Sequence, residues 1–198
     1  FIFIGGVLGV TSFVKRRNIN NLANVVEEEI VSNEKGDEVV EQYLQVDPIE
    51  IEIGYGLISL VDESQGGNLF NKIYTTRKFI ALEFGVLIPP VRVRDNLQLS
   101  PNEYIIKIKG NIVSQFEIHP DRSLAMNPGG IEEQIDGIPT KDPAFGLQSF
   151  WVTREEKDRA ELLGFTVVDA ISVLSTHLQE TLKTDFDKIL SRQAVKQL

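Results

Sequence analysis

Cysteine is missing from this sequence of 198 residues, which also holds only 2 histidines. Without cysteine the chain can form neither disulfides nor thiolate metal sites, and the absence fits a reducing compartment. The imidazoles of His119 and His177 would have to meet from separate parts of the chain, together with carboxylates, to hold zinc or iron. The sequence therefore predicts no metal centre.

The sequence also has fewer basic than acidic residues. The 20 lysines and arginines stand against 29 acidic residues, which gives a formal net charge of −9 at pH 7. Binding to nucleic acid relies on a basic field that releases counterions from the phosphates, so the balance argues against a nucleic-acid partner. The cations Arg92, Arg94, Lys107 and Lys109 are scattered along strand-like segments. This placement is typical of the solvated face of a sheet.

Motifs for nucleotide binding and catalysis are absent. The sequence has no G-x-x-x-x-G-K-[ST], no G-x-G-x-x-G between strand and helix, no H-E-x-x-H and no G-x-S-x-G. Ser175, Thr176 and His177 are adjacent, but neighbouring helical residues point about 100° apart, so we interpret them as a polar helix face. Asp136 and Asp142 lack a second catalytic group at a useful spacing. We therefore expect no enzyme activity and no cofactor.

The sequence has few long hydrophobic runs, and the one at its beginning is short. Residues 1–14, FIFIGGVLGVTSFV, fall below the roughly 20 residues that span a bilayer. The basic KRR at 15–17 follows this run, whereas a signal peptide carries its charges first. We interpret residues 1–17 as the end of a transmembrane helix, with everything after residue 17 on the cytoplasmic side. The alternative is a buried element at the start of a domain.

Residues 18–46 are acidic and poor in large apolar side chains, which is the composition of a flexible linker. A folded α+β body is expected after it. Ile49, Ile51 and Ile53 alternate with glutamates, which predicts a strand with one buried face. Apolar spacing predicts an amphipathic helix over residues 68–84, and two β-rich runs predict a hairpin over residues 102–118. This order favours a sheet with helices on one face.

Residues 121–169 differ in texture and predict a small inserted unit. Turn-forming residues fill its first part, and a strand at 149–153, a helix at 154–163 and a strand at 165–169 are expected after them. Trp151 is expected in the core. Asp169 then caps a long helix whose apolar stripe runs to Ile189.

One aromatic residue interrupts the turn-rich part of the insert. In DPAFGL, residues 142–147, Phe145 is surrounded by proline, aspartate and glycine, which favour irregular backbone. The ring either fills the core under its own loop or is left for a partner to cover. An aromatic anchor at an interface contributes about 2 to 4 kcal/mol. The local pattern leaves both interpretations open.

Several blocks of sequence together resemble one protein family. They are VDPIEIEIGYGLISLVD (46–62), IPPVRVRDNLQLSPNEYIIKIKG (88–110), LAMNPGG (124–130), DPAFGLQSFWV (142–152) and GFTVVDAISVLSTHL (164–178). From about residue 46 to its end, the chain resembles the FHIPEP family of type III export proteins. The blocks DPAFGL and VVDAISVLSTHL favour the flagellar branch of that family.

The resemblance implies a protein of the bacterial inner membrane. Its cytoplasmic part would be a docking platform for flagellar export chaperones with their cargo, assembled as a nine-membered ring alongside other export-apparatus subunits. It also implies a ferredoxin-like or RRM-like first subdomain (48–120 plus 170–189), an inserted second subdomain (121–169) and the start of a third (190–198). An RNA-binding module of ferredoxin-like fold and a purely structural ring component are the alternatives.

The resemblance further implies which residues matter. Asp142, Phe145 and Thr176 fall in blocks associated with chaperone docking, which favours a partner-facing Phe145 beside a groove between the two subdomains. Thr176 would project about 140° away from the apolar stripe of its helix. Gly54 matches a position where the family depends on glycine, for a positive φ or for close backbone approach.

Overall fold

The computed structural model describes residues 46–189. Three expected segments lie outside this range: the transmembrane remnant at 1–17, the linker at 18–46 except for Val46, and the third subdomain from residue 190. Within the described part of the chain, no helix is both long enough and apolar enough to cross a membrane.

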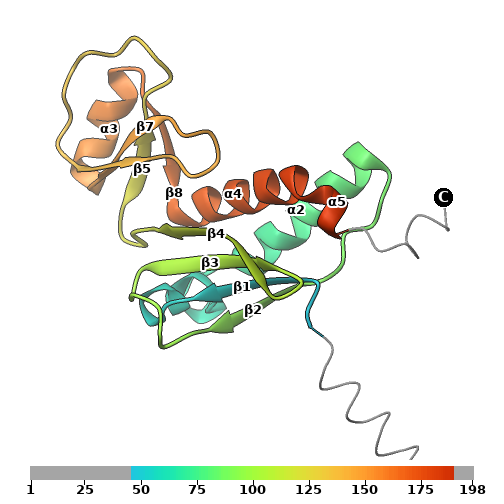
Figure 1. The fold of residues 1–198 in the computed structure, drawn as a ribbon. Coiled ribbons are helices and arrows are strands. Elements are labelled where there is room, and N and C mark those ends of the chain that lie inside the picture. Colours follow the sequence, from blue (N-terminus) through green and yellow to red (C-terminus); the bar gives the residue numbers. More distant parts are fainter. Residues whose placement is uncertain (1–45, 190–198) are drawn as a thin grey trace, which may run out of the picture. The chain divides into compact units, whose positions relative to one another are not determined.

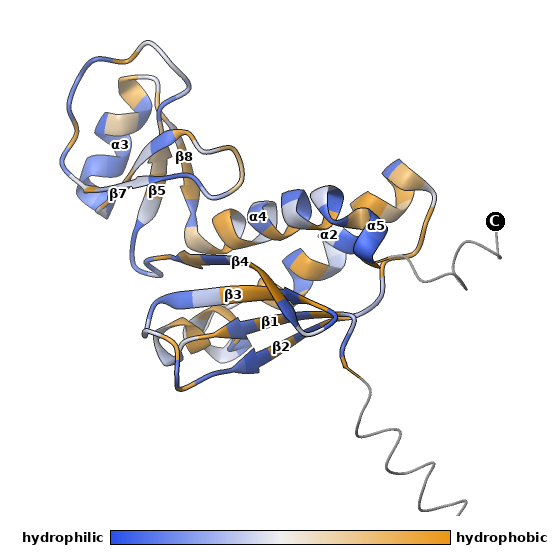
Figure 2. Ribbon diagram, viewed as in Figure 1, coloured by the Kyte–Doolittle hydropathy of each residue, from blue (hydrophilic) through white to orange (hydrophobic). Residues whose placement is uncertain are grey.

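The first sheet has the strand order β2-β1-β3-β4 (Figure 1). Its centre is β1 (Ile49–Ile53), which pairs parallel with β2 (Val91–Asp95) and antiparallel with β3 (Glu103–Ile108). The strand β4 (Asn111–Glu117) forms the predicted hairpin with β3. The colours along β1 alternate between hydrophobic and hydrophilic, as expected for a strand with one buried face (Figure 2).

Two helices cover one face of this sheet. The helix α2 (Leu69–Phe84) leads from β1 to β2 after two 3-10 turns, η1 (Tyr55–Leu60) and η2 (Glu63–Gln65). The helix α4 (Ala170–Thr184) comes after the insert and packs beside α2. The inward isoleucines of β1 and β3 form one core with the buried side chains of α2 and α4, namely Leu69, Ile73, Ile80, Val173, Leu174, Leu178 and Leu182.

The α+β class is confirmed, but the strand order corrects the ferredoxin-like expectation. In a split β-α-β unit another strand separates the two parallel strands, whereas β1 and β2 are direct partners. Their register places Glu50 opposite Arg92 and Glu52 opposite Arg94, so opposite charges face each other across the pair. The hairpin occupies the other edge of β1.

The insert forms a second, antiparallel sheet with the order β6-β7-β5-β8. Its strands are β5 (Ser123–Met126), β6 (Ile138–Lys141), β7 (Gln148–Val152) and β8 (Thr166–Asp169), and α3 (Arg154–Leu162) packs on them. This sheet has a small core of its own, made of Ala125, Ile135, Val152, Ala160 and Phe165. Leu124 and Trp151 instead belong to the core of the first sheet.

The ends of the insert lie side by side. Ser123 at the start of β5 and Asp169 at the end of β8 are partners in the ladder that joins these strands. Asp169 caps α4 as expected, because its carboxylate accepts the amide hydrogen of Ser172 at 2.8 Å. The long helix predicted from here to residue 189 is broken at Asp185, and the last turn is a separate helix, α5 (Phe186–Ile189).

Candidate docking site

Residues 142–147, called the docking loop below, form a closed loop between β6 and β7. The amide of Asp142 donates to the carbonyl of Leu147 at 2.8 Å, and the amide of Gly146 donates to the carbonyl of Asp142 at 2.9 Å. The Asp142 carboxylate accepts the amide hydrogen of Phe145 at 2.6 Å. Gly146 has a φ of 71°, a conformation that glycine adopts without strain. Asp142 thus organises the loop from a buried position, with 5% of its surface exposed.

The ring of Phe145 is exposed, so it does not fill the core under its own loop. Its exposed fraction is 61%, and it is absent from both core clusters. Ile138 on β6 and Leu147 at the end of the loop are also exposed. The docking loop therefore presents two apolar side chains, Phe145 and Leu147, to solvent, and Ile138 is exposed at the far end of β6.

Thr176 is half-buried on α4, between two residues that are buried. The polar face expected at these positions is largely buried, since Ser175 and His177 are each less than one-tenth exposed. For His177 the reason is a pair of hydrogen-bond partners on β3 and β4. His177 Nδ1 and the hydroxyl of Tyr104 share a hydrogen bond of 2.6 Å, and His177 Nε2 and the hydroxyl of Ser114 share another of 2.6 Å.

Burial and charge set the protonation of this cluster. Burial lowers the pKa of His177 from 6.5 to about 4, so the ring is neutral at physiological pH. Burial raises the pKa of Tyr104 well above its ordinary value, and the negative charge of Asp142 raises it further. Sequence reasoning missed Tyr104, although an inward-facing tyrosine needs a partner for its hydroxyl.

Gly54 is required for close backbone approach rather than for a positive φ. Its φ is −67°, and a Cβ atom added there would stand 2.1 Å from the carbonyl oxygen of Ser100 and 2.6 Å from that of Pro101. The amide of Gly54 also donates to the carbonyl of Glu103 at 2.8 Å. Any side chain at position 54 would separate the end of β1 from the segment before β3.

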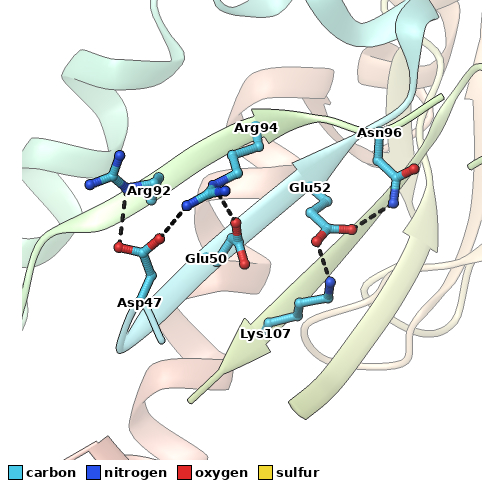
Figure 3. Close-up of polar contacts among 7 residues, drawn as sticks. All are labelled: Asp47, Glu50, Glu52, Arg92, Arg94, Asn96 and Lys107. Atoms are coloured by element: carbon cyan, nitrogen blue, oxygen red, sulfur yellow. Dashed lines mark hydrogen bonds and ion pairs between the residues drawn. The ribbon is translucent and has the colours of Figure 1, made fainter. Parts of the chain in front are cut away.

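The outer face of the first sheet carries a network of ion pairs and hydrogen bonds (Figure 3). Arg94 bridges two carboxylates, at 2.7 Å from Asp47 and 2.7 Å from Glu50. Burial by itself raises the pKa of Glu52, but hydrogen bonds from Lys107 and Asn96 outweigh it and hold this pKa below its usual value.

The same face bears on the RNA-binding alternative. The strands β1 and β3 lie at the centre of the sheet, and their outward positions hold glutamates, Ile105 and Lys107. RNA-binding sheets instead expose aromatic rings on their central strands, where bases can stack. This alternative therefore lacks its stacking platform.

The two histidines have separate partners. His119 packs edge-on against Trp151, with 5.6 Å between the ring centroids. His177 is hydrogen-bonded to Tyr104 and Ser114. Within residues 46–189, no cluster of three or more histidine and acidic side chains could hold a metal ion.

The fold matches solved structures of type III secretion proteins. Similarity to the Chlamydia pneumoniae CdsV protein has a TM-score of 0.64 at 22% identity, over 77% of this chain and 45% of that one. CdsV in a complex with CdsO gives a TM-score of 0.63 at 22% identity, over 77% of this chain and 48% of that one. The nonameric EPEC SctV-C gives a TM-score of 0.53 at 11% identity, over 77% of this chain and 44% of that one. At these identities the likeness defines the fold: that of the cytosolic domains of these proteins.

Sequence comparison defines the family. The FHIPEP family model matches residues 1–198, and the chain belongs to this family. It is 49% identical over 175 residues to the flagellar biosynthesis protein FlhA of Bacillus subtilis, covering 88% of this chain and 26% of that protein. It is 35% identical over 198 residues to FlhA of Escherichia coli, covering 100% of this chain and 29% of that protein. The chain thus spans less than a third of the length of these relatives.

Proposed function

We propose that this chain is the membrane-proximal cytoplasmic part of a flagellar type III export protein, and that its docking loop and Thr176 bind export chaperones carrying cargo. The observation that carries the proposal is the pairing of a buried Asp142 with an exposed Phe145. A phenylalanine that a short loop holds in solvent adds nothing to the core, but it suits an interface anchor. Family membership and the similarity to FlhA support the same function.

Thr176 completes the proposed surface with a hydroxyl from another element. It is half-buried on α4 and follows the buried Ser175. Phe145 would supply apolar contact, while Thr176 would supply hydrogen bonding at the surface between the first and second subdomains. Those subdomains would comprise residues 48–120 plus 170–189 and residues 121–169. Gly54 would act indirectly, by holding the first subdomain together.

The surroundings of this surface follow from the same proposal. The intact protein would lie in the bacterial inner membrane, with residues 1–17 ending its membrane part, residues 18–46 as a linker and the rest on the cytoplasmic side. Ring assembly is supported by the neighbour described as nonameric, and contact with other export subunits by the complex of CdsV with CdsO. The role is non-enzymatic, with no cofactor and no nucleic-acid partner.

Titration calorimetry of the intact protein against flagellar chaperone–cargo complexes tests the proposal. Phe145→Ala is expected to weaken binding by more than tenfold, because the anchor is lost, while the melting temperature stays nearly unchanged. Leu162→Ala is the matched control, since Leu162 is an exposed apolar residue of the same insert outside the docking loop. Equal losses in both variants, or no binding by the unsubstituted protein, would contradict docking at Phe145 and favour a purely structural ring component.

A further inference from the structure

A polar cluster joins α4, the helix that carries Thr176, to the β3–β4 hairpin. It consists of Tyr104 on β3, Ser114 on β4 and His177 on α4, joined by two hydrogen bonds of 2.6 Å. Tyr104 is fully buried and His177 is 5% exposed. The cluster therefore ties the helix that carries Thr176 to both strands of the hairpin.

The hydrogen-bonding capacity of the cluster is matched in its neutral form. A neutral imidazole has one N–H donor and one nitrogen acceptor, and each hydroxyl can take either role. The high pKa of Tyr104 keeps the proton on its hydroxyl, and the low pKa of His177 keeps the ring neutral. Among the described residues, no buried side-chain nitrogen or oxygen lacks a partner. The cluster thus holds α4 by directional bonds rather than by packing alone.

The hydroxyl of Tyr104 is not needed to fill the core. The tyrosine ring packs edge-on against Phe116 and His177, with ring centroids 6.5 Å and 5.7 Å away. A phenylalanine ring could make the same contacts. Replacing both partners of a buried hydrogen bond by apolar groups of similar shape is often nearly neutral for stability. A role in geometry accounts for the polar pair better than a role in stability.

The cluster adjoins one residue of the proposed docking surface, because His177 follows Thr176 directly in α4. Its hydrogen bonds hold that part of α4 against β3 and β4. We propose that Tyr104 and His177 are positioning residues of the docking surface, which fix Thr176 on α4 relative to the β3–β4 hairpin through their hydrogen bond. This inference rests on the proposed function, and its partner is the same chaperone–cargo complex.

Removing one oxygen tests the inference. Tyr104→Phe in the intact protein is expected to weaken chaperone–cargo binding about tenfold. Its melting temperature should also fall, because His177 Nδ1 loses its buried partner. Tyr74→Phe is the matched control, because the Tyr74 side chain on α2 is 65% exposed, and it should leave affinity unchanged. Hydrogen exchange of the Thr176 amide should accelerate in Tyr104→Phe but not in Tyr74→Phe. The ring ¹⁵N signals of His177 should show a single neutral tautomer in the unsubstituted protein and a mixture in Tyr104→Phe.

The readouts separate the two proposals. If the unsubstituted protein binds no chaperone–cargo complex, the proposed function fails, while the exchange and ¹⁵N data still report whether Tyr104 and His177 position Thr176. If binding depends on Phe145 but Tyr104→Phe changes neither affinity nor exchange, the positioning role is overturned. Should Tyr104→Phe fail to fold, Tyr104→Phe/His177→Leu replaces both partners. Unchanged affinity in that folded double variant also overturns the inference.

Discussion

The carboxylate of Asp142 accepts the amide hydrogen of Phe145 at 2.6 Å, so a buried residue of the docking loop fixes the backbone of an exposed one. The two residues that the family resemblance joined as docking residues therefore have different physical roles. Phe145 exposes an apolar ring, whereas Asp142 fixes the backbone that carries this ring. Substitutions at the two positions should differ in how they divide between binding and stability.

Asp142→Ala should lower the free energy of unfolding by about 1 to 2 kcal/mol, because the Phe145 amide loses its acceptor. Asp142→Asn keeps a side-chain oxygen for that amide and should cost less than half as much. Denaturant unfolding gives the energies, and amide hydrogen exchange at residues 143–147 reports the loop directly. Slow exchange of the Phe145 amide in Asp142→Ala would show that the carboxylate does not hold the loop.

Phe145→Ala and Trp151→Ala should differ widely in stability, although both remove an aromatic ring from the insert. Trp151 is 1% exposed and belongs to the main core, so its truncation should cost about 3 to 5 kcal/mol. Phe145 is 61% exposed, and its truncation should change stability by no more than about 0.5 kcal/mol. Chemical unfolding of both variants measures the difference. Similar losses of unfolding free energy in the two variants would show that the Phe145 ring packs in the core.

Gly54→Ala should destabilise the protein more than Gly85→Ala does. At position 54 the new methyl group would overlap two backbone carbonyls, and we expect a loss of about 3 kcal/mol or more. Gly85 has a φ of 71° and no atoms near its absent Cβ, so alanine there meets only conformational strain of about 1 kcal/mol. Melting curves of the two variants provide the comparison, and equal shifts would argue against a close approach at Gly54.

Stability should fall as the pH is lowered from 6.5 to 4 because of His177. In the unfolded chain this histidine takes up a proton near its ordinary pKa of 6.5, whereas in the folded protein its pKa is about 4. Between these values the unfolded state binds more protons, so acid favours it, by roughly 2 to 3 kcal/mol over the window. His177→Gln lacks this contribution. The two proteins should therefore show different slopes of unfolding free energy against pH, and parallel slopes would contradict a depressed pKa.

Local pattern predicted β1, α2 and the β3–β4 hairpin well, because alternation and helical spacing can be recognised in short windows. It missed β5 and β6 in the part of the insert that was expected to be rich in turns. The isoleucines of β1 alternate as expected, and Leu69, Ile73 and Ile80 form the buried face of α2. The strand order could not be predicted, since it depends on which edge of β1 pairs with the hairpin. A short window of sequence carries no information about that pairing.

The candidate site was only partly readable for the same reason. Phe145 was visible as an anomaly in its loop, but its exposure depends on how the loop closes on Asp142. His177 was misjudged because its partners, Tyr104 and Ser114, lie 73 and 63 residues away in the chain. A polar residue on a helix looks solvated until the strands opposite it supply hydroxyls.

The pairing of Ser123 with Asp169 makes the insert a side branch of the chain. The chain enters and leaves the insert at paired residues of neighbouring strands. The distance between the end of β4 and the start of α4 therefore does not depend on the length of the insert. Evolution could then lengthen or exchange the outer loops of the insert, and with them the choice of partner, while Asp169 keeps α4 capped and seated on the sheet.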